Sequence, residues 1–220
     1  MIPLSDASRR PLRVPAVTAL IIAVNVAVFL LELANGDPFV LRWSLVPASV
    51  VAGRNWITIL TAMFLHAGWL HIVGNMVFLW AFGPEIEDVM GRVRYPIFYL
   101  LGGSVAFLAQ TIVNPTSTVP TLGASGAIAA VMGAFLVTYP RDRIRTVVFL
   151  FLFATVTFIP AAILVGVWFL IQVFSEIGVL ASGQTNGVAF MVHVSGFLFG
   201  ALSARFFEIR ERRVAQGLER

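Results

Sequence analysis

The sequence predicts an all-α, polytopic membrane protein, built as a bundle of six transmembrane helices with both termini on the cytoplasmic side. Hydrophobic residues make up 59% of the 220 positions and charged residues 12%, with a mean hydropathy of +0.91. Such values are typical of integral membrane proteins rather than soluble domains. The chain has no cysteine, which excludes disulfides, a thiol nucleophile and thiolate metal sites.

Six apolar segments suit the length of a membrane span. We expect the spans at residues 14–34, 69–82, 95–113, 124–139, 161–181 and 188–207. Residues 1–13 would then be a short cytoplasmic tail, 14–207 the membrane domain and 208–220 a charged cytoplasmic tail. No cleavable signal peptide is evident, since the first apolar run is long enough to remain as an anchor.

Three connections are less regular. Residues 38–68 predict a long outer loop with short interfacial helices, because tryptophan favours the headgroup level; alternatively, residues 57–65 begin the second span. Gly83-Pro84 is expected to end that span, and a charged connection follows to residue 94. Residues 147–159, rich in Phe and β-branched side chains, are interpreted as an apolar connecting segment before Pro160, with a single kinked helix as the alternative.

The arginines support this topology. All 15 basic residues are arginines, and only Arg42 and Arg54 fall on the predicted outside. The other arginines fall in predicted cytoplasmic segments, as the positive-inside rule requires. The net charge of +4 is therefore interpreted as a topology signal, not as a nucleic-acid-binding surface.

A serine between glycines opens the fourth span, in the stretch Gly123-Ala124-Ser125-Gly126. A helix start offers unpaired backbone N–H groups and the positive end of the helix dipole, which an oxyanion site needs. The span is short, so Ser125 would lie below the outer membrane surface. A small-residue packing helix with an ordinary serine is the plainer alternative.

His193 is the predicted partner of Ser125. Gly196 and Gly200 follow it on one helix face, and Ala129 and Gly133 continue the face of Ser125. Two flat faces permit close helix packing, which would bring the imidazole to the serine hydroxyl as its base. A helix-packing histidine is the alternative.

His71 and Asn75 share a helix face at i and i+4 and could donate hydrogen bonds to an oxyanion. Tethering of the outer loop is the alternative for both, and it is preferred for His66. A metal site from the three histidines is disfavoured, since no carboxylate lies near them in sequence on the outer side. Gln172 and Glu176 could mark a polar channel, although a structural role in the fifth span is favoured.

Together these motifs resemble the rhomboid intramembrane serine proteases. The resemblance rests on three stretches in order: His66-x4-His71-x3-Asn75, Gly123-Ala124-Ser125-Gly126 and His193-x2-Gly196-x3-Gly200. It implies that Ser125 is the nucleophile and His193 the general base, without a third carboxylate. It further implies that His71, Asn75 and backbone N–H groups near Ser125, at Gly123, support the oxyanion. The remaining motif residues, His66, Gly126, Gly133, Gly196 and Gly200, are expected to pack the site.

The implied activity is cleavage of peptide bonds in or near transmembrane helices of membrane-protein substrates. No cofactor, metal or nucleic acid is expected; the partners would be such substrates and the lipid bilayer. The resemblance suggests a multi-pass protein of a bacterial-type plasma membrane, with its active site near the outer face. A non-catalytic rhomboid-like protein that binds or escorts transmembrane segments is the alternative, and a small transporter is a third possibility.

This chain departs from the family pattern at three positions. Trp56 is followed by Ile57 where the family often has arginine, and Val192 precedes the histidine where many members have alanine. Ala129 stands where many members have an aromatic residue that stacks on the histidine. Substrates are expected to enter sideways past the fifth span, where Trp168 and Phe169 could form a gate or could simply face lipid.

Overall fold

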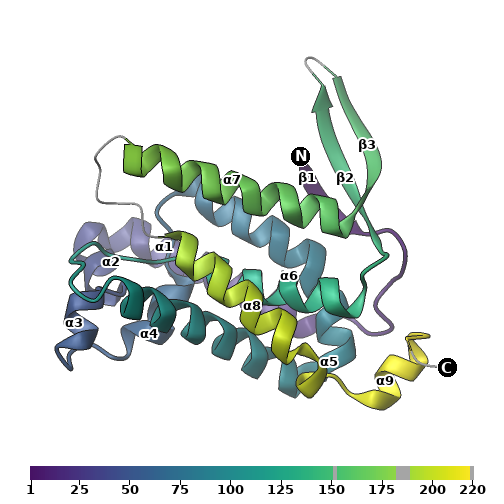
Figure 1. Cartoon of the computed structure of the whole chain (residues 1–220), viewed down its shortest axis with the longest axis horizontal. Coiled ribbons are helices and arrows are strands. Elements are labelled where there is room, and N and C mark those ends of the chain that lie inside the picture. Colours follow the sequence, from purple (N-terminus) through teal and green to yellow (C-terminus); the bar gives the residue numbers. More distant parts are fainter. Residues whose placement is uncertain (151–152, 182–188, 219–220) are drawn as a thin grey trace.

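The computed structural model describes residues 1–150, 153–181 and 189–218, with the backbone alone at 150, 172–181 and 189. Five long helices lie side by side (Figure 1): α1 (Ala16–Asn35), α5 (Trp69–Val113), α6 (Ser125–Thr138), α7 (Ala161–Ala181) and α8 (Ala189–Phe207). Short helices gather at one end of the bundle, namely α2 (Asp37–Trp43), α3 (Pro47–Val51), α4 (Thr58–Thr61) and η1 (Ala62–Phe64). Helix α9 (Arg210–Ala215) lies at the other end.

The helices have the length and composition of membrane spans. Within the described residues, three are long and apolar enough to cross a bilayer: Ala16–Asn35, Trp69–Val113 and Phe190–Phe207. Ser125–Thr138 and Ala161–Ile171 are shorter apolar helices. The side chains of Gln172 and Glu176, and the loop expected at residues 182–187, lie outside the described part of the chain.

Helix α5 corrects the expected end of the second span, because Gly83-Pro84 does not stop it. The helix runs to Val113, and its one non-helical residue is Gly91, with φ 83° and ψ 165°. Beyond Pro84 the acidic side chains are buried and bonded: the Glu87 carboxylate accepts the backbone N–H groups of Val17 (3.0 Å) and Thr18 (2.7 Å) at the start of α1. Element α5 is therefore two arms, residues 69–90 and 92–113, that bend at Gly91.

The fold is not all-α. A three-stranded antiparallel sheet forms from β1 (Ile2–Asp6), β2 (Arg143–Leu150) and β3 (Phe153–Pro160), in the order β1-β2-β3. The described residues of the stretch 147–159, namely 147–150 and 153–159, thus form strands, rather than the expected apolar connecting segment or the alternative of a kinked helix. Their Val, Thr and Phe side chains favour the extended backbone, and Pro160 ends the strand before α7. Strand β1, which comes from the N-terminal tail, joins the sheet by pairing with β2.

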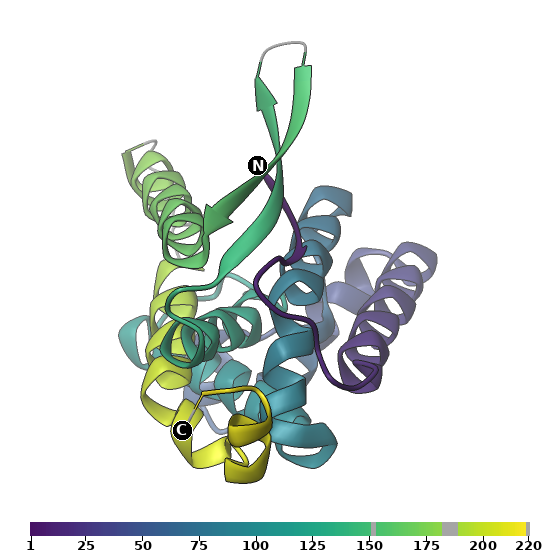
Figure 2. The ribbon, with the colours of Figure 1, turned by 90° about the vertical axis from the view of Figure 1, so that its right-hand side faces the viewer.

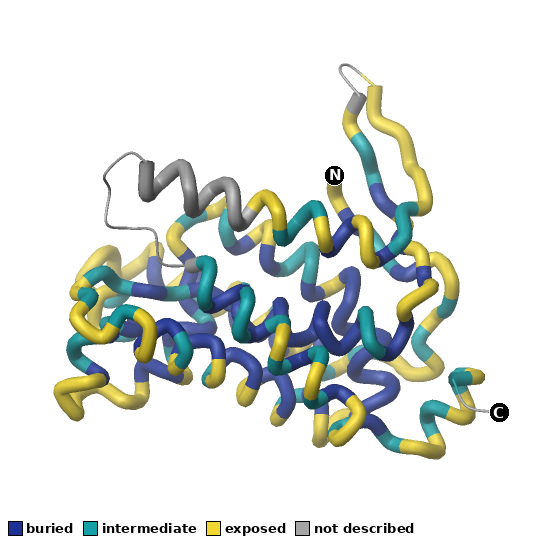
Figure 3. Tube along the Cα trace, in the orientation of Figure 1, coloured by how far each residue is buried: buried dark blue, intermediate teal, exposed yellow. Residues whose placement is uncertain are grey.

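Helix α6 occupies the centre of the bundle and is buried along almost its whole length (Figure 3). Its contact with α8 is close enough for the two backbones to touch. A Cβ atom built at Gly196 would collide with the carbonyl oxygen of Gly126, and one at Gly200 with that of Ala130. The predicted α8 face therefore does meet α6 backbone against backbone. On α6 the contact runs through Gly126 and Ala130, one position beyond the predicted Ser125 and Ala129, and through the predicted Gly133.

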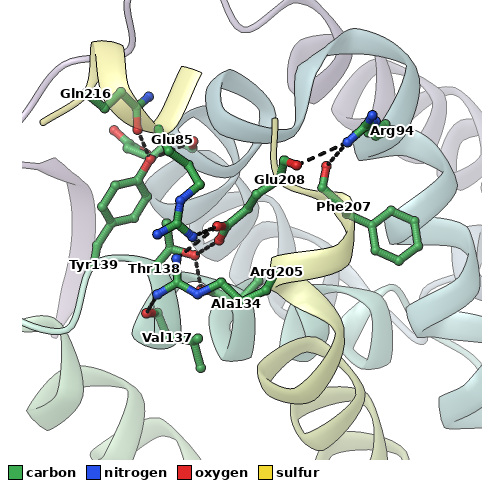
Figure 4. Close-up of polar contacts among 11 residues, drawn as sticks. Glu85, Arg94, Ala134, Val137, Thr138, Tyr139, Arg205, Phe207, Glu208 and Gln216 are labelled. Atoms are coloured by element: carbon green, nitrogen blue, oxygen red, sulfur yellow. Dashed lines mark hydrogen bonds and ion pairs between the residues drawn. The ribbon is translucent and has the colours of Figure 1, made fainter. Parts of the chain in front are cut away.

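Hydrogen bonds and ion pairs of charged side chains link the segments at the end of the bundle that carries α9 (Figure 4). The carboxylate of Glu208 accepts the Thr138 hydroxyl (2.5 Å) and pairs with Arg205 (2.9 Å) and Arg213. Arg94 donates to the Glu208 carbonyl oxygen at 3.1 Å. These contacts join the ends of α6 and α8 to α9 and to the second arm of α5.

Candidate active site

Ser125 is the first residue of α6 and follows a loop that contacts the short helix η1. The chain reaches it through a fixed turn: Thr121 pairs with Leu45, and the Gly123 N–H donates to the Ala62 carbonyl at 2.9 Å. Gly123 has φ +126°, which only glycine adopts without strain. The half-buried serine is thus presented at a helix start by a loop that is anchored on both sides.

His193 lies beside Ser125. Its Nε2 is 2.8 Å from the Ser125 Oγ, and the residue is only 4% exposed. This distance follows from the α6–α8 packing, because the glycines that remove the space between the helices stand one and two turns beyond His193 on its own face. His193 Nδ1 has no hydrogen-bond partner among the described residues, so the described contacts form a pair rather than a triad.

Trp168 of α7 supplies the aromatic contact to this histidine. The Trp168 and His193 ring centroids are 5.2 Å apart, with an interplanar angle of 72°. The sequence has Ala129, not an aromatic residue, one turn beyond the serine. In this chain a different helix therefore provides the ring that packs on the imidazole.

His71 and Asn75 lie on the first arm of α5 and face the same region. The Ala67 N–H donates to His71 Nδ1 at 3.3 Å, which places the proton of a neutral ring on Nε2. That Nε2 lies against Gly123: a Cβ there would be 3.0 Å from it and 3.7 Å from Ser125 Oγ. The buried Asn75 Nδ2 has no hydrogen-bond partner among the described residues. Two N–H donors are therefore free near the serine.

The backbone N–H of Gly123, which was expected to support the oxyanion, makes a different hydrogen bond in the structure. This N–H is already bonded to Ala62, as described above, so it is not free for an oxyanion. The N–H of Ser125, at the first position of α6, has no partner within the helix. It is the backbone donor that the loop leaves available.

His66 packs beneath this site rather than within it. Its backbone N–H donates to the buried Glu32 carboxylate at 3.0 Å, and its ring lies edge-on to Phe29 and to His71, with a His66–His71 centroid distance of 5.2 Å. Burial lowers the pKa of His66 to about 4, so the ring is neutral at physiological pH. Glu32, whose carboxylate anchors the loop that carries His66, belongs to α1 and is far away in sequence. For this reason the sequence did not reveal the contact.

A cavity of about 190 Å³ opens between the first arm of α5, α6 and α7. Its lining includes His71, Asn75 and Trp168, so it gives access to the two free donors.

Phe169, the second predicted gate residue, turns to α8, with ring centroids 5.8 Å from Phe190 and 6.1 Å from Phe197. Trp168 also lies 6.1 Å from Phe78 of α5. The two aromatics thus stand where α7 meets its neighbours.

The described residues contain no group of three or more His, Cys, Asp and Glu side chains that could hold a metal ion. The reactive groups that the site does bring together are the Ser125 hydroxyl, the His71 and His193 imidazoles and the Asn75 amide. A hydroxyl paired with an imidazole, with N–H donors nearby, is the arrangement of a nucleophile, its base and an oxyanion site.

Residues 53–209 match the Rhomboid domain family. The chain belongs to the rhomboid family. It is similar to the rhomboid protease GluP of Bacillus subtilis, with 31% identity over 133 residues, which are 59% of this chain and 26% of that protein. The putative rhomboid protease YdcA of the same organism is 31% identical over 86 residues, 39% of this chain and 43% of the relative.

Relatives also occur outside bacteria. The RHOMBOID-like protein 6, mitochondrial, of Arabidopsis thaliana is 38% identical over 93 residues, which are 40% of this chain and 28% of that protein. The chain spans less than half the length of each of these three relatives. The matched residues of the rhomboid domain include the serine, His66, His71, Asn75 and His193.

Proposed function

We propose that this rhomboid is an intramembrane serine endopeptidase that cleaves peptide bonds in or near the transmembrane helices of membrane-protein substrates. The observation that carries the proposal is the 2.8 Å contact between Ser125 Oγ and His193 Nε2. It is supported by the buried Asn75 Nδ2 on α5, which has no hydrogen-bond partner among the described residues. An inactive relative would have no need to keep these groups together in a closely packed interface.

In the proposed first step, the Ser125 hydroxyl donates its proton to His193 Nε2 while Oγ attacks the scissile carbonyl carbon. The carbonyl oxygen becomes an oxyanion, which Asn75 Nδ2, His71 Nε2 and the Ser125 N–H stabilise. The protonated imidazole then gives its proton to the leaving amine, and the C–N bond breaks. An ester between Ser125 and the substrate acyl group remains.

In the second step, water attacks this ester with His193 again acting as the base. The cavity beside Asn75 and His71 offers a path for that water. The packing of Trp168 on His193 keeps the imidazole in one orientation through both steps. Ser125 and the neutral His193 are then regenerated.

Substrate preference follows from the same geometry. A helix hides its peptide bonds, so a substrate has to unwind locally before Ser125 can reach a carbonyl. Gly or Pro near the end of the substrate helix lowers the cost of unwinding. The confined surroundings of Ser125, with Gly123 and Gly126 on either side, favour a small residue just before the scissile bond.

For topology, we propose six spans with both termini in the cytoplasm, counting the two arms of α5 separately. The site would then lie near the outer face, and the two Bacillus relatives favour a bacterial plasma membrane. Because the chain has no cysteine, single introduced cysteines report sidedness directly. Arg54→Cys should react with an impermeant maleimide from outside intact cells, and Arg141→Cys only after the membrane is opened.

Labelling with a fluorophosphonate tests the catalytic proposal. The probe should attach to Ser125 in the wild type and fail to attach to Ser125→Ala or His193→Ala, and both variants should lose cleavage of a transmembrane reporter. If a folded wild type is not labelled and does not cleave, while it still binds transmembrane segments, the chain is a binding or escort protein instead.

A further inference from the structure

The β2–β3 hairpin carries an apolar surface that the helix bundle leaves uncovered. Residues 146–159 contain no charged side chain. Phe149, Phe153 and Phe158 are 58%, 79% and 54% exposed. Figure 3 shows the described part of the hairpin exposed along most of its outer half, where it projects beyond the helices. A surface of this kind needs an apolar environment.

One face of the hairpin carries both basic and apolar side chains. The strand register places Phe158 opposite Arg145 and Val156 opposite Val147, so these side chains share a face with Arg143 and Phe149. Arg143 and Arg145 stand at the base of the hairpin, Phe158 lies level with Arg145, and Val147, Val156 and Phe149 lie toward the tip. This face therefore presents guanidinium groups next to apolar side chains, a combination that suits the interface between lipid headgroups and acyl chains.

Neither bulk water nor the hydrocarbon core suits the hairpin. In water, an uncharged apolar hairpin with open edges would pair with other chains and aggregate. Deep in the hydrocarbon, the unpaired backbone groups along the outer edges of β1 and β3 would have no partners. The headgroup region meets both needs, because it offers water and phosphates to the edges and the upper acyl chains to the phenylalanines.

The position of the hairpin agrees with this environment. In Figure 1 the hairpin runs mainly across the axes of the long helices, and those axes mark the membrane normal. Figure 2 shows it leaving the bundle sideways, between α7 and the first arm of α5. It therefore extends along the membrane plane rather than away from the membrane.

The basic side chains at the base of the hairpin are available for lipid. Arg141, Arg143 and Arg145 are exposed, and their guanidinium groups make no ion pair with the described residues. By contrast, the guanidinium group of Arg9, near the base of the hairpin, pairs with the Asp142 carboxylate. Exposed arginines beside a bilayer attract anionic headgroups.

We propose that the β2–β3 hairpin is a lipid-binding element that lies in the headgroup region of the bilayer that the helices span, on its arginine-rich side. Phe149, Phe153 and Phe158 contact acyl chains, and Arg143 and Arg145 bind the phosphates of anionic phospholipids. This role is independent of proteolysis, so an inactive Ser125→Ala protein would retain it.

Site-specific fluorescence in nanodiscs tests the location. The chain has no cysteine, so Phe153→Cys can be labelled alone with an environment-sensitive dye. Matched controls are Arg54→Cys in the exposed loop before α4 and Leu202→Cys, 75% exposed on the membrane-spanning α8. The Phe153 dye should be quenched by nitroxide-bearing lipid as the Leu202 dye is, and should be shielded from iodide.

Two results would overturn the location. Iodide quenching equal to that of the Arg54 dye would place the hairpin in water. Shielding from both iodide and nitroxide lipid would mean that protein covers the hairpin, either a second copy or a substrate.

A second measurement tests the arginines. The Phe153 dye should be quenched more strongly by nitroxide on phosphatidylglycerol than by the same nitroxide on phosphatidylcholine, by about fivefold for each arginine at the surface. Arg143→Gln with Arg145→Gln should lower the ratio by the factor that these two arginines contribute, whereas Arg54→Gln should not change it. A ratio that is the same in the wild type and the double variant would remove anionic lipid from the proposal.

Discussion

His193 is held between two side chains, with the Ser125 hydroxyl on one side and the indole of Trp168 on the other. The imidazole is almost fully buried, so few other orientations are open to it. Because α7 supplies the tryptophan, the orientation of the base depends on a helix other than the two that carry the dyad. A movement of α7 would therefore affect both access and chemistry.

Asn75→Ala should lower turnover by about 10–1000-fold and leave KM nearly unchanged, since an oxyanion donor acts mainly in the transition state. The free, buried Nδ2 is the reason for this expectation. Steady-state cleavage of a transmembrane reporter gives both constants. Normal turnover with a raised KM would make Asn75 a binding or structural residue.

Substitutions of Trp168 and Phe169, made one at a time, are expected to have different effects on the rate of cleavage. Phe169→Ala removes packing against α8 without touching the dyad, so it should speed cleavage of a transmembrane substrate and leave a short soluble peptide nearly unaffected. Trp168→Ala frees the imidazole, so it should slow both substrates. Equal effects of Phe169→Ala on the two substrates, or no effect, would contradict the gate.

The sequence motifs placed Ser125 beside His193 and located Asn75, because helical spacing and small residues are local signals. They did not reveal Trp168 on the histidine or Glu32 beneath His66, because both contacts join distant parts of the chain. Nor did they reveal that the N–H of Gly123 is bonded to Ala62, a contact that depends on how the preceding loop folds back.

At the scale of elements, the α6–α8 interface sets the distance within the dyad. Gly196→Ala should push the helices apart, because its new methyl group would meet the Gly126 carbonyl. Overpacking of this kind costs about 1–3 kcal/mol. Both thermal stability and cleavage should fall, as followed by melting in detergent and by the reporter assay.

Gly166→Ala on α7 is the matched control, since nothing lies within 4 Å of a Cβ at that position. It makes the same chemical change in another apolar helix and should leave stability and activity close to those of the wild type. If the two variants lose equal stability, the close packing at Gly196 does not account for the effect, because helix propensity alone favours alanine over glycine.

Two elements differ from the sequence-based expectation for physical reasons. Pro84 suggested a helix end, but α5 continues to Gly91, and the buried Glu87 carboxylate beyond Pro84 caps the first turn of α1. Residues 147–154 carry no polar side chain, and only Thr155 and Thr157 alternate with apolar residues in 147–159, which is too short a pattern to identify two strands. Their pairing partner, β1, lies in the N-terminal tail, which hydropathy alone marked as polar.

At the scale of the whole molecule, Arg9 ties the N-terminal segment to the hairpin and the C-terminal segment. Its guanidinium pairs with Asp142, lies 4.3 Å from the centroid of the Tyr139 ring and donates to the Gln216 carbonyl at 3.3 Å. Asp6 lies 3.9 Å from the same guanidinium. Three distant parts of the chain thus meet around one arginine.

This cluster predicts a pH dependence of stability. Burial, with the Asp142 carboxylate as a further cause, raises the pKa of Asp6 from 3.8 to about 7. The folded protein then holds this proton more tightly than the unfolded chain does. The contribution of Asp6 to stability is therefore greatest at acid pH and is lost as the pH rises toward about 7.

Asp6→Asn keeps an oxygen acceptor for the Ser8 N–H but cannot ionise. The melting temperature of this variant should exceed that of the wild type increasingly as the pH rises through about 7. Thermal melts across this range give the comparison. Parallel curves for the two proteins would show that folding does not raise the pKa of Asp6.

The central claim is that Ser125 is a nucleophile activated by His193. The most direct measurement is the rate of fluorophosphonate attachment to Ser125 in the folded, detergent-solubilised protein, with the modified peptide located by mass spectrometry. The account predicts attachment at Ser125 in the wild type and a loss of several decades in rate in His193→Ala. Equal rates in the wild type and in a folded His193→Ala protein, or modification at another serine, would contradict it.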